Sequence, residues 1–271
     1  MHSVEAPPSV VVGIDGSAAA VGAALWGVDE AIARDIPLRL VYAIDPREPV
    51  RRDADSFAHR FATAEIAVRS AFMAVEASQQ AVKIEIEIVH EHPVATLMRA
   101  SRSAAMMCLG AARHSRLKRL GSTASALSAS AHCPVALLRG HDKVVRGGGG
   151  WIGVGLDRSS QNRVLVRRAM GEARLRRAPL RILIPRHLFD GPAADAAADS
   201  CIGPEPDLDF HSVPVRGSIA DYLNDHAQSV KLFVVGADGL GQPDSAVQSV
   251  LYDTDCPLLI LRGDPAQDRR P

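Results

Sequence analysis

The chain contains one segment twice, and this internal repeat limits its fold more than any other feature. Residues Val11–Ser17 read VVGIDGS, and Ile152–Ser159 read IGVGLDRS. Asp15 in the first copy therefore aligns with Asp157 in the second, 142 residues later. Because repeated segments share a structure, we expect two domains of the same fold in a single chain.

Both copies also end alike, and these endings set the predicted domain boundaries. HCPVALLRG at 132–140 matches DCPLLILRG at 255–263, and a run of glycines precedes the second copy. We predict a first domain at 1–140, a Gly-rich linker at 141–150 and a second domain at 151–271. Each domain is long enough to bury its own hydrophobic core.

Short apolar runs alternate with longer segments of helical period in both copies. The runs lie at 9–14, 38–44, 84–89, 106–110 and 134–138, and again at 151–156, 180–184, 208–213, 231–235 and 258–262. This order predicts the α/β class, with a five-stranded parallel sheet and helices on both faces in each domain. The crossover connections should be right-handed.

The second copy is shorter between its second and third predicted strands. MMCLGA at 106–111 matches LFVVGA at 232–237, so the offset has fallen from 142 to 126. The first copy uses residues 45–82 for this connection, and the second uses 185–206. We therefore expect a shortened crossover in the second copy, with a helix missing or reduced.

Composition argues against several classes of partner. Lys plus Arg and Asp plus Glu both number 31, so no global field attracts nucleic acid or anionic lipid. No apolar run approaches the roughly 20 residues that span a bilayer. The first residues lack the apolar centre of an export signal. We expect a cytoplasmic protein that binds neither nucleic acid nor membrane.

Some residues that often carry chemistry are better explained as structural. Cys108, Cys133 and Cys256 lie in apolar surroundings without a CxxC pair, which predicts reduced core cysteines. Trp26 and Trp151 adjoin apolar segments, and we expect them in the core as well.

A metal site and a catalytic site are both poorly supported. His90 and His92 lie on one face of a predicted strand beside Glu91, a grouping that invites a metal interpretation. The spacing places no further ligand, and no GxSxG, HExxH or Walker A motif occurs. We predict no metal site and no enzymatic activity.

In a parallel sheet the ligand crevice lies at the carboxyl ends of the strands, where the strand order reverses. Asp15 follows the first strand there, and Ser17 is suited to cap the next helix. The Asp15 carboxylate could accept a hydrogen bond from a purine amino group or a ribose hydroxyl. It could equally serve only to form the turn.

The connection after the fourth strand begins at Gly110 and ends at Gly121-Ser122-Thr123, which opens an Ala/Ser-rich helix. Helix starts and glycine backbones suit a phosphate. The basic residues between them are Arg113, His114, Arg116, Lys118 and Arg119. They could bind a di- or triphosphate through charge-assisted hydrogen bonds, or simply form a solvated basic loop.

Together these segments resemble the universal stress protein family in its tandem two-domain form. The resemblance rests on VGIDGS and VGLDRS, the glycine after the fourth strand, Gly121-Ser122, and the endings HCPVALLR and DCPLLILR. It covers nearly the whole chain and implies two tandem Rossmann-like (HUP-type) domains. It also implies ATP, with Mg²⁺, as the ligand of members that carry the motif G-x2-G-x9-G-[S/T].

The first copy departs from that motif after its first glycine. Gly110 is followed by Arg113 in place of glycine, and only seven residues precede Gly121. Arg113 either blocks the phosphate or replaces N–H contacts by a guanidinium. The residues to which the resemblance assigns ATP contacts are Asp15 at the adenine or ribose, Val41 in the adenine pocket, and Gly110, Arg113, Gly121, Ser122 and Thr123 at the phosphates.

The second copy departs at the other end of the motif. Gly236 and Gly239 are correctly spaced, but Ser249-Val250 stands where Gly-[S/T] is expected. Asp157, Gly236 and Gly239 would serve a nucleotide here, in a site whose phosphate end is weakened by Ser249.

Two functions follow from these patterns. The first is an ATP-binding regulatory protein of the stress response that acts without a dedicated reaction. The alternative is an interaction module of the same fold whose crevices bind no nucleotide. The apolar last strands of the two halves, 134–138 and 258–262, are expected to pair within one chain, and a homodimer is a further expected assembly.

Overall fold

The architecture comes from a computed structural model. It describes residues 7–47, 55–111, 120–139, 149–157, 161–187, 198, 200–202, 207–238, 240 and 245–262. Arg113, Gly239 and most of the predicted linker lie outside these residues. The fold divides into two compact units, Met1–Asp142 and Lys143–Pro271.

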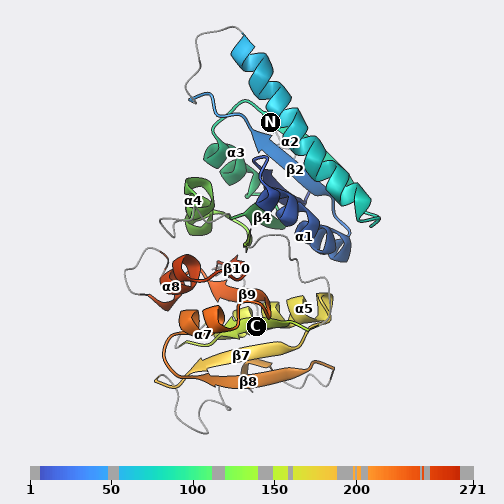
Figure 1. The fold of residues 1–271 in the computed structure, drawn as a ribbon. Helices are drawn as coiled ribbons and strands as arrows, with labels where there is room; N and C mark the ends of the chain where they lie inside the picture. The colour runs from blue at the N-terminus through green and yellow to red at the C-terminus, as the bar shows by residue number, and fades with distance from the viewer. Residues whose placement is uncertain are drawn as a thin grey trace, which may run out of the picture. The chain divides into compact units, whose positions relative to one another are not determined.

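The first unit is a five-stranded parallel sheet with the order β3-β2-β1-β4-β5 (Figure 1). Its elements are β1 (Val10–Ile14), α1 (Ala18–Arg34), β2 (Leu38–Ala43), α2 (Asp55–Ala77), β3 (Ile84–Val89), α3 (Pro93–Ala100), β4 (Met106–Gly110), α4 (Ser122–Ser130) and β5 (Val135–Leu138). Helix α1 packs beside α2, and α3 packs beside α4, so the sheet is covered on both faces.

The second unit repeats this plan with the order β8-β7-β6-β9-β10. Its elements are β6 (Trp151–Gly155), α5 (Asn162–Leu175), β7 (Leu180–Pro185), β8 (Phe210–Val215), α7 (Ile219–Asp225), β9 (Val230–Gly236), α8 (Ala246–Asp253) and β10 (Leu258–Leu261). All of these strand pairs are parallel as well.

The predicted α/β class and tandem Rossmann-like architecture are confirmed. The largest deviation is in β8, which begins at Phe210 where the apolar pattern placed it at 208. The shortened crossover is present too. In the first unit α2 alone takes 23 residues between β2 and β3. In the second unit the whole connection is 186–209, with helical residues described at 198 and 200–202.

The buried residues match the predicted core. Trp26 and Trp151 are 7% and 2% exposed, and Cys108, Cys133 and Cys256 are buried free thiols. Burial raises the pKa of the Cys133 thiol to about 12, so this thiol stays protonated at neutral pH.

In each sheet the strand order reverses beside the first strand of the copy. β1 lies between β2 and β4, and β6 lies between β7 and β9. The connections that leave neighbouring strand ends there run in opposite directions, which opens a crevice at the carboxyl edge. The fold therefore provides one candidate crevice in each unit.

Candidate functional site

The turn after β1 holds Asp15 at the carboxyl edge of the first sheet. Its Oδ1 accepts a hydrogen bond from the backbone N–H of Ser17 at 2.9 Å, and Gly16 has a φ of 83°. The Ser17 hydroxyl in turn accepts from the N–H of Ala20 at 3.1 Å and caps α1. The turn-forming role of Asp15 is thus real. Its exposed Oδ2 has no partner among the described residues, so it can also accept from a ligand.

Gly110 ends β4 next to this turn, and packing alone explains why it is a glycine. A Cβ atom at Gly110 would lie 2.4 Å from the carbonyl carbon of Ala19 and 2.4 Å from the nitrogen of Ala20. Both atoms belong to the backbone of α1, which cannot yield cheaply. Gly110 therefore allows α1 to approach the sheet, whatever ligand binds nearby.

Val41 lies in β2, one strand away from this turn. It pairs with Gly13 of β1, and its side chain is 1% exposed. The residue is a core residue of the sheet, and its contact with an adenine ring stays a prediction.

Helix α4 begins without a side-chain cap. Its N-cap is Gly121, which has no side chain that could accept a hydrogen bond from the first-turn N–H groups. The backbone N–H of Ser125 donates to the carbonyl of Gly121 at 2.9 Å. The amides of Ser122 and Thr123 precede it at the helix start. An uncapped helix start of this kind is suited to an anion.

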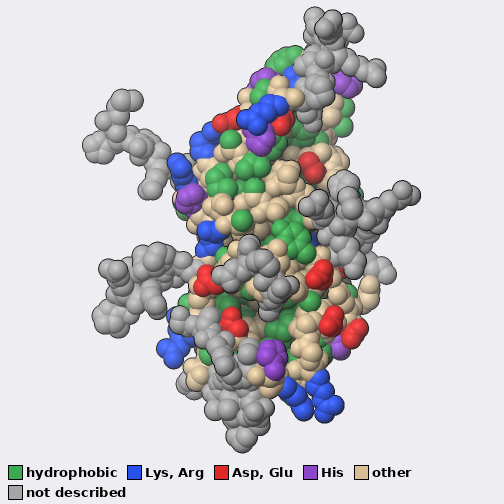
Figure 2. All heavy atoms as spheres, turned by 90° about the vertical axis from the view of Figure 1, so that its left-hand side faces the viewer, with side chains coloured by type: hydrophobic (Ala, Val, Ile, Leu, Met, Phe, Trp, Pro, Cys, Tyr) green, Lys and Arg blue, Asp and Glu red, His purple; other side chains and the backbone are tan. Residues whose placement is uncertain are grey.

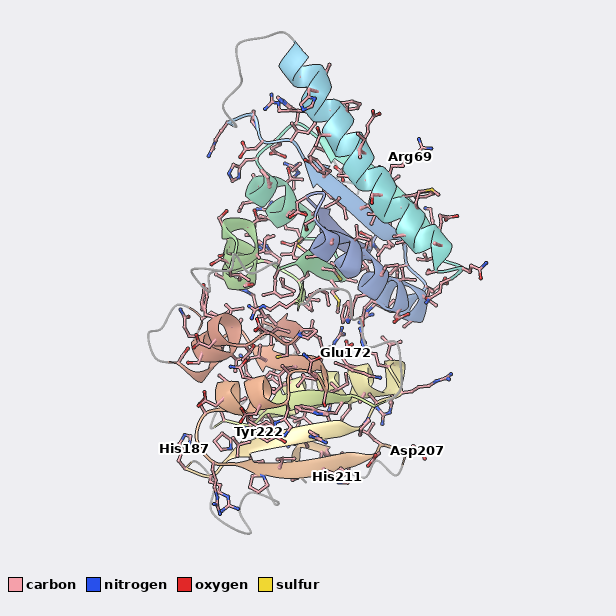
Figure 3. The ribbon with its side chains drawn as sticks, in the orientation of Figure 1. Arg69, Glu172, His187, Asp207, His211 and Tyr222 are labelled. Atoms are coloured by element: carbon pink, nitrogen blue, oxygen red, sulfur yellow. The ribbon has the colours of Figure 1, made fainter. Side chains whose placement is uncertain are left out.

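The crevice of the second unit is a defined cavity of about 450 Å³. Residues at the ends of β6, β7 and β9 and at the starts of α5, α7 and α8 line it. Its apolar wall includes Leu156, Leu165, Ile219, Val247 and Val250, and its polar residues are Asp157, Gln161, His187, Ser218, Asp238 and Ser249. Figure 3 places His187 at one end of this sheet and Asp207, which precedes β8, at the other.

Two side-chain contacts organise the mouth of this cavity. Gln161, the N-cap residue of α5, donates through Nε2 to Oδ2 of Asp238 at 2.5 Å. The side-chain amide of Asn162 makes two hydrogen bonds to the backbone of Asp157. Its Nδ2 donates to the Asp157 carbonyl at 2.7 Å, and its Oδ1 accepts from the Asp157 N–H at 3.2 Å.

Helix α8 has a side-chain N-cap, in contrast to α4, whose N-cap residue is a glycine. The Ser245 hydroxyl accepts from the N–H of Gln248 at 3.0 Å. Of the two glycines predicted to contact a nucleotide in this unit, only Gly236 can be described. Gly236 ends β9, and a Cβ there would meet only the tip of Gln161 at 3.0 Å and the Leu165 side chain beyond it. Gly239 lies outside the described residues.

The predicted residues thus gather at two sheet edges, and several functional candidates were missed. Asp15 and Gly110 adjoin across the β1–β4 pair, and Asp157 and Gly236 line the cavity of the second unit. Gln161, His187, Ser218 and Asp238 were not predicted. Each follows a strand end, which is the signal that identifies them.

Glu91, the carboxylate between His90 and His92, is bound by neighbouring side chains. No group of three or more His, Cys, Asp or Glu side chains is positioned for a metal within the described segments. Glu91 instead accepts from Arg99 at 2.9 and 2.5 Å and from the Thr96 hydroxyl at 2.9 Å. The Arg99 guanidinium, followed by the Thr96 hydroxyl, holds the pKa of Glu91 below its usual value.

Over the part of the chain that the structure describes, every helix is too short or too polar to span a bilayer.

Comparisons with known proteins agree with this architecture. The model of the universal stress protein family matches residues 8–139. A universal stress protein of Mycobacterium tuberculosis is 44% identical over 277 residues, covering 96% of this chain and 98% of that protein. A second one from the same organism is 37% identical over 264 residues, covering 94% and 96%.

A solved structure shows the same fold over both units. The crystal structure of a universal stress protein from Archaeoglobus fulgidus superimposes with a TM-score of 0.74 at 17% identity. The match covers 94% of this chain and 98% of that one. Full-length relatives at this level of identity, together with the shared fold, establish that the chain belongs to the universal stress protein family.

Proposed function

We propose that this chain is a regulatory protein of the stress response that binds an adenine nucleotide, ATP, in its first unit. Binding would change its interactions with partner proteins in the cytoplasm, without a dedicated chemical reaction. The observation that carries the proposal is the start of α4 at Gly121, an N-cap without a side-chain hydrogen bond, which follows a basic connection in the sequence.

The residues present fit a triphosphate. The first turn of α4 directs backbone N–H groups toward the end of the β4–α4 connection, and the N-cap residue Gly121 has no side chain to cap them. That connection supplies Arg113, Arg116, Lys118 and Arg119 by sequence. Guanidinium and ammonium groups bind phosphate oxygens by charge-assisted hydrogen bonds.

The residues present also fit the nucleoside end. Asp15 is exposed at the end of β1, with one carboxylate oxygen engaged by the turn and the other directed to no described partner. This oxygen would accept from a ribose hydroxyl or an adenine amino group. Mg²⁺, when bound with ATP, would neutralise part of the phosphate charge.

A variant at the helix start tests the proposal directly. Gly121→Asp places a carboxylate where the phosphate would bind, and Asp is a better N-cap than Gly, so the helix should not be weakened. Calorimetry with Mg²⁺-ATP should show wild-type binding in the micromolar to millimolar range, and at least a tenfold loss in the variant. Ser245→Asp, the same change of cap in the second unit, is the matched control and should leave ATP binding unchanged.

Nucleotide retained by the purified protein gives an independent readout. Heat-released supernatant should contain adenine nucleotide by mass spectrometry, and protein carrying Gly121→Asp should release little. The proposal is wrong if the supernatant contains no adenine nucleotide and the dissociation constant for ATP is larger than about 1 mM.

The alternative function is an interaction module without nucleotide, and Gly110 favours it. Because packing against α1 already requires this glycine, its presence is no sign of a phosphate site. This alternative predicts that Asp15→Ala retains full activity in a stress-survival assay. Loss as severe as deletion would count against it. The pairing of the last strands and the homodimer stay predictions, to be measured by solution mass and cross-linking.

A further inference from the structure

We propose that the cavity of the second unit binds an uncharged, ring-bearing molecule of nucleoside size and rejects its phosphorylated forms. This site is separate from the proposed ATP site, and its ligand differs in charge. The inference rests on the cavity's size, on its wall and on the electrostatics of its mouth.

The cavity has room for a ring system with one polar substituent. Its volume of about 450 Å³ lies within the range of small-molecule pockets. The wall is mainly aliphatic, with Leu156, Leu165 and Ile219 among its members. Of these, Leu156 and Leu165 are 1% and 5% exposed, so the wall belongs to the packed core of the unit. A flat apolar ring gains free energy by leaving water for such a surface.

The mouth of the cavity is acidic. Asp157 and Asp238 are its charged lining residues among those described, and no described lysine or arginine lines it. The sequence of the β9–α8 connection agrees, because residues 237–245 include two aspartates and no lysine or arginine. On the face of the second unit that Figure 2 shows, acidic side chains lie beside apolar ones, and basic side chains lie farther toward its margin. A phosphate placed here would meet like charge.

Backbone N–H groups that could bind a phosphate are also occupied at two of the helix starts beside the cavity. Ser245 caps α8 with its own hydroxyl, and the side chain of Gln161 at the start of α5 is hydrogen-bonded to Asp238. Ser218 likewise caps α7 by accepting from the N–H of Asp221 at 3.0 Å. Two of the three helix starts around the cavity, those of α7 and α8, are thus capped by a serine side chain, whereas the start of α5 has no side-chain cap and lies beside the carboxylate of Asp238.

The same mouth suits a neutral ligand that carries hydrogen-bond donors. Carboxylates accept hydrogen bonds from hydroxyl and amino groups. Asp157 and Asp238 would therefore bind the hydroxyl-bearing end of a nucleoside while its ring lies against the aliphatic wall. Adenosine is the probe, and AMP and ATP test the rejection of phosphate.

The experiment uses the full-length chain carrying Gly121→Asp, which silences the proposed first site. Calorimetry with adenosine should detect binding, and ATP should bind at least tenfold more weakly. Ser249→Trp fills the cavity from α8 and should reduce adenosine affinity at least tenfold. Gln248→Trp adds the same side chain one position away, outside the cavity lining, and should leave adenosine binding intact.

A charge variant keeps the test independent of cavity filling. Asp238→Lys should improve AMP affinity at least fivefold relative to Asp253→Lys, which makes the same charge change at an exposed residue outside the lining. Circular dichroism melting curves establish that each variant is folded.

Three results would overturn the proposal. They are no adenosine binding, adenosine binding that survives Ser249→Trp, and ATP binding that equals adenosine binding and is lost in Ser249→Trp. An Asp238→Lys variant with unchanged AMP affinity would remove its electrostatic basis. None of these outcomes decides whether the first unit binds ATP, because that site is tested by Gly121→Asp against wild type.

Discussion

The β4–α4 connection of the first unit and the β9–α8 connection of the second occupy the same place in the fold, and they have opposite electrostatics. The first contains three arginines, a lysine and a histidine and leads to the uncapped helix start at Gly121. The second contains two aspartates and leads to Ser245, which caps its own helix. By its sequence, the connection in the first unit would therefore attract an anion, and the connection in the second unit would repel one.

The turns after the first strands of the two units are also held by different side chains. In the first unit, Asp15 and Ser17 build the turn with their own side chains, and Gly16 supplies the positive φ. In the second unit, the side chain of Asn162 holds the backbone of Asp157 from inside the helix. The strands that bury both faces are alike in the two copies, while the loops that face the crevices have diverged. Function should therefore be assigned to each unit separately.

The largest expected difference between the units is one of stability, at the glycines that end β4 and β9. Gly110→Ala should destabilise the protein by about 3 kcal/mol, because the new Cβ collides with the backbone of α1. Gly236→Ala should cost less than about 1 kcal/mol, because only the end of Gln161 must move. Urea unfolding followed by circular dichroism measures both.

Equal losses of unfolding free energy in Gly110→Ala and Gly236→Ala would contradict this predicted difference between the units. They would mean that both strands are approached equally closely by their helices.

The sequence predicts the strands well for a physical reason that does not extend to the crevices. Central parallel strands are buried on both faces and read as continuous Val, Ile and Leu runs, as in β1 and β9. The contact between Gln161 and Asp238 joins side chains 77 residues apart, and no local pattern signals it. The cap at Ser245 was predictable, because Ser followed three residues later by Gln is a capping-box pattern.

Salt should separate the two proposed ligands. Raising the ionic strength from 0.05 to 0.5 M should weaken ATP binding roughly tenfold, because exposed basic side chains are screened from the phosphates. Adenosine binding to the second unit should change less than about twofold, since the ligand carries no net charge. Calorimetry across a salt series gives both slopes. Parallel slopes would show that the two crevices do not differ in the charge of their ligands.

The helix caps give a smaller difference. Ser245→Ala should destabilise the protein by about 1 kcal/mol, because it removes the acceptor for the Gln248 N–H. Gly121→Ser in the first unit should stabilise it by a few tenths of a kcal/mol, because it adds the acceptor that α4 lacks. The same serine should weaken ATP binding by competing for the helix start. A serine that stabilises α4 and leaves ATP affinity unchanged would place the phosphates elsewhere.

The smallest expected effect concerns the ion pair between Glu91 and Arg99 at helix α3 of the first unit. Glu91 accepts from Arg99, while Gly217 stands at the equivalent turn in the second unit and Ser218 caps α7. Because this pairing lowers the pKa of Glu91 in the folded state, its contribution is complete above the unfolded value of about 4.3. It is lost as the pH falls through the lower folded value.

Glu91→Gln should therefore lower the melting midpoint slightly at pH 6 to 7, and the difference from wild type should shrink as the pH falls through the lowered pKa of Glu91. The effect is small because the pair is largely solvent-exposed, where water screens it. Glu76→Gln, at an exposed carboxylate on α2, is the control and should not shift the midpoint over the same pH range. A difference that instead grows as the pH falls would reverse the sign and show that Glu91 is stabilised in its protonated form. In that case the start of α3 would depend on hydrogen bonding by a neutral side chain, and the two units would resemble each other more closely at this turn.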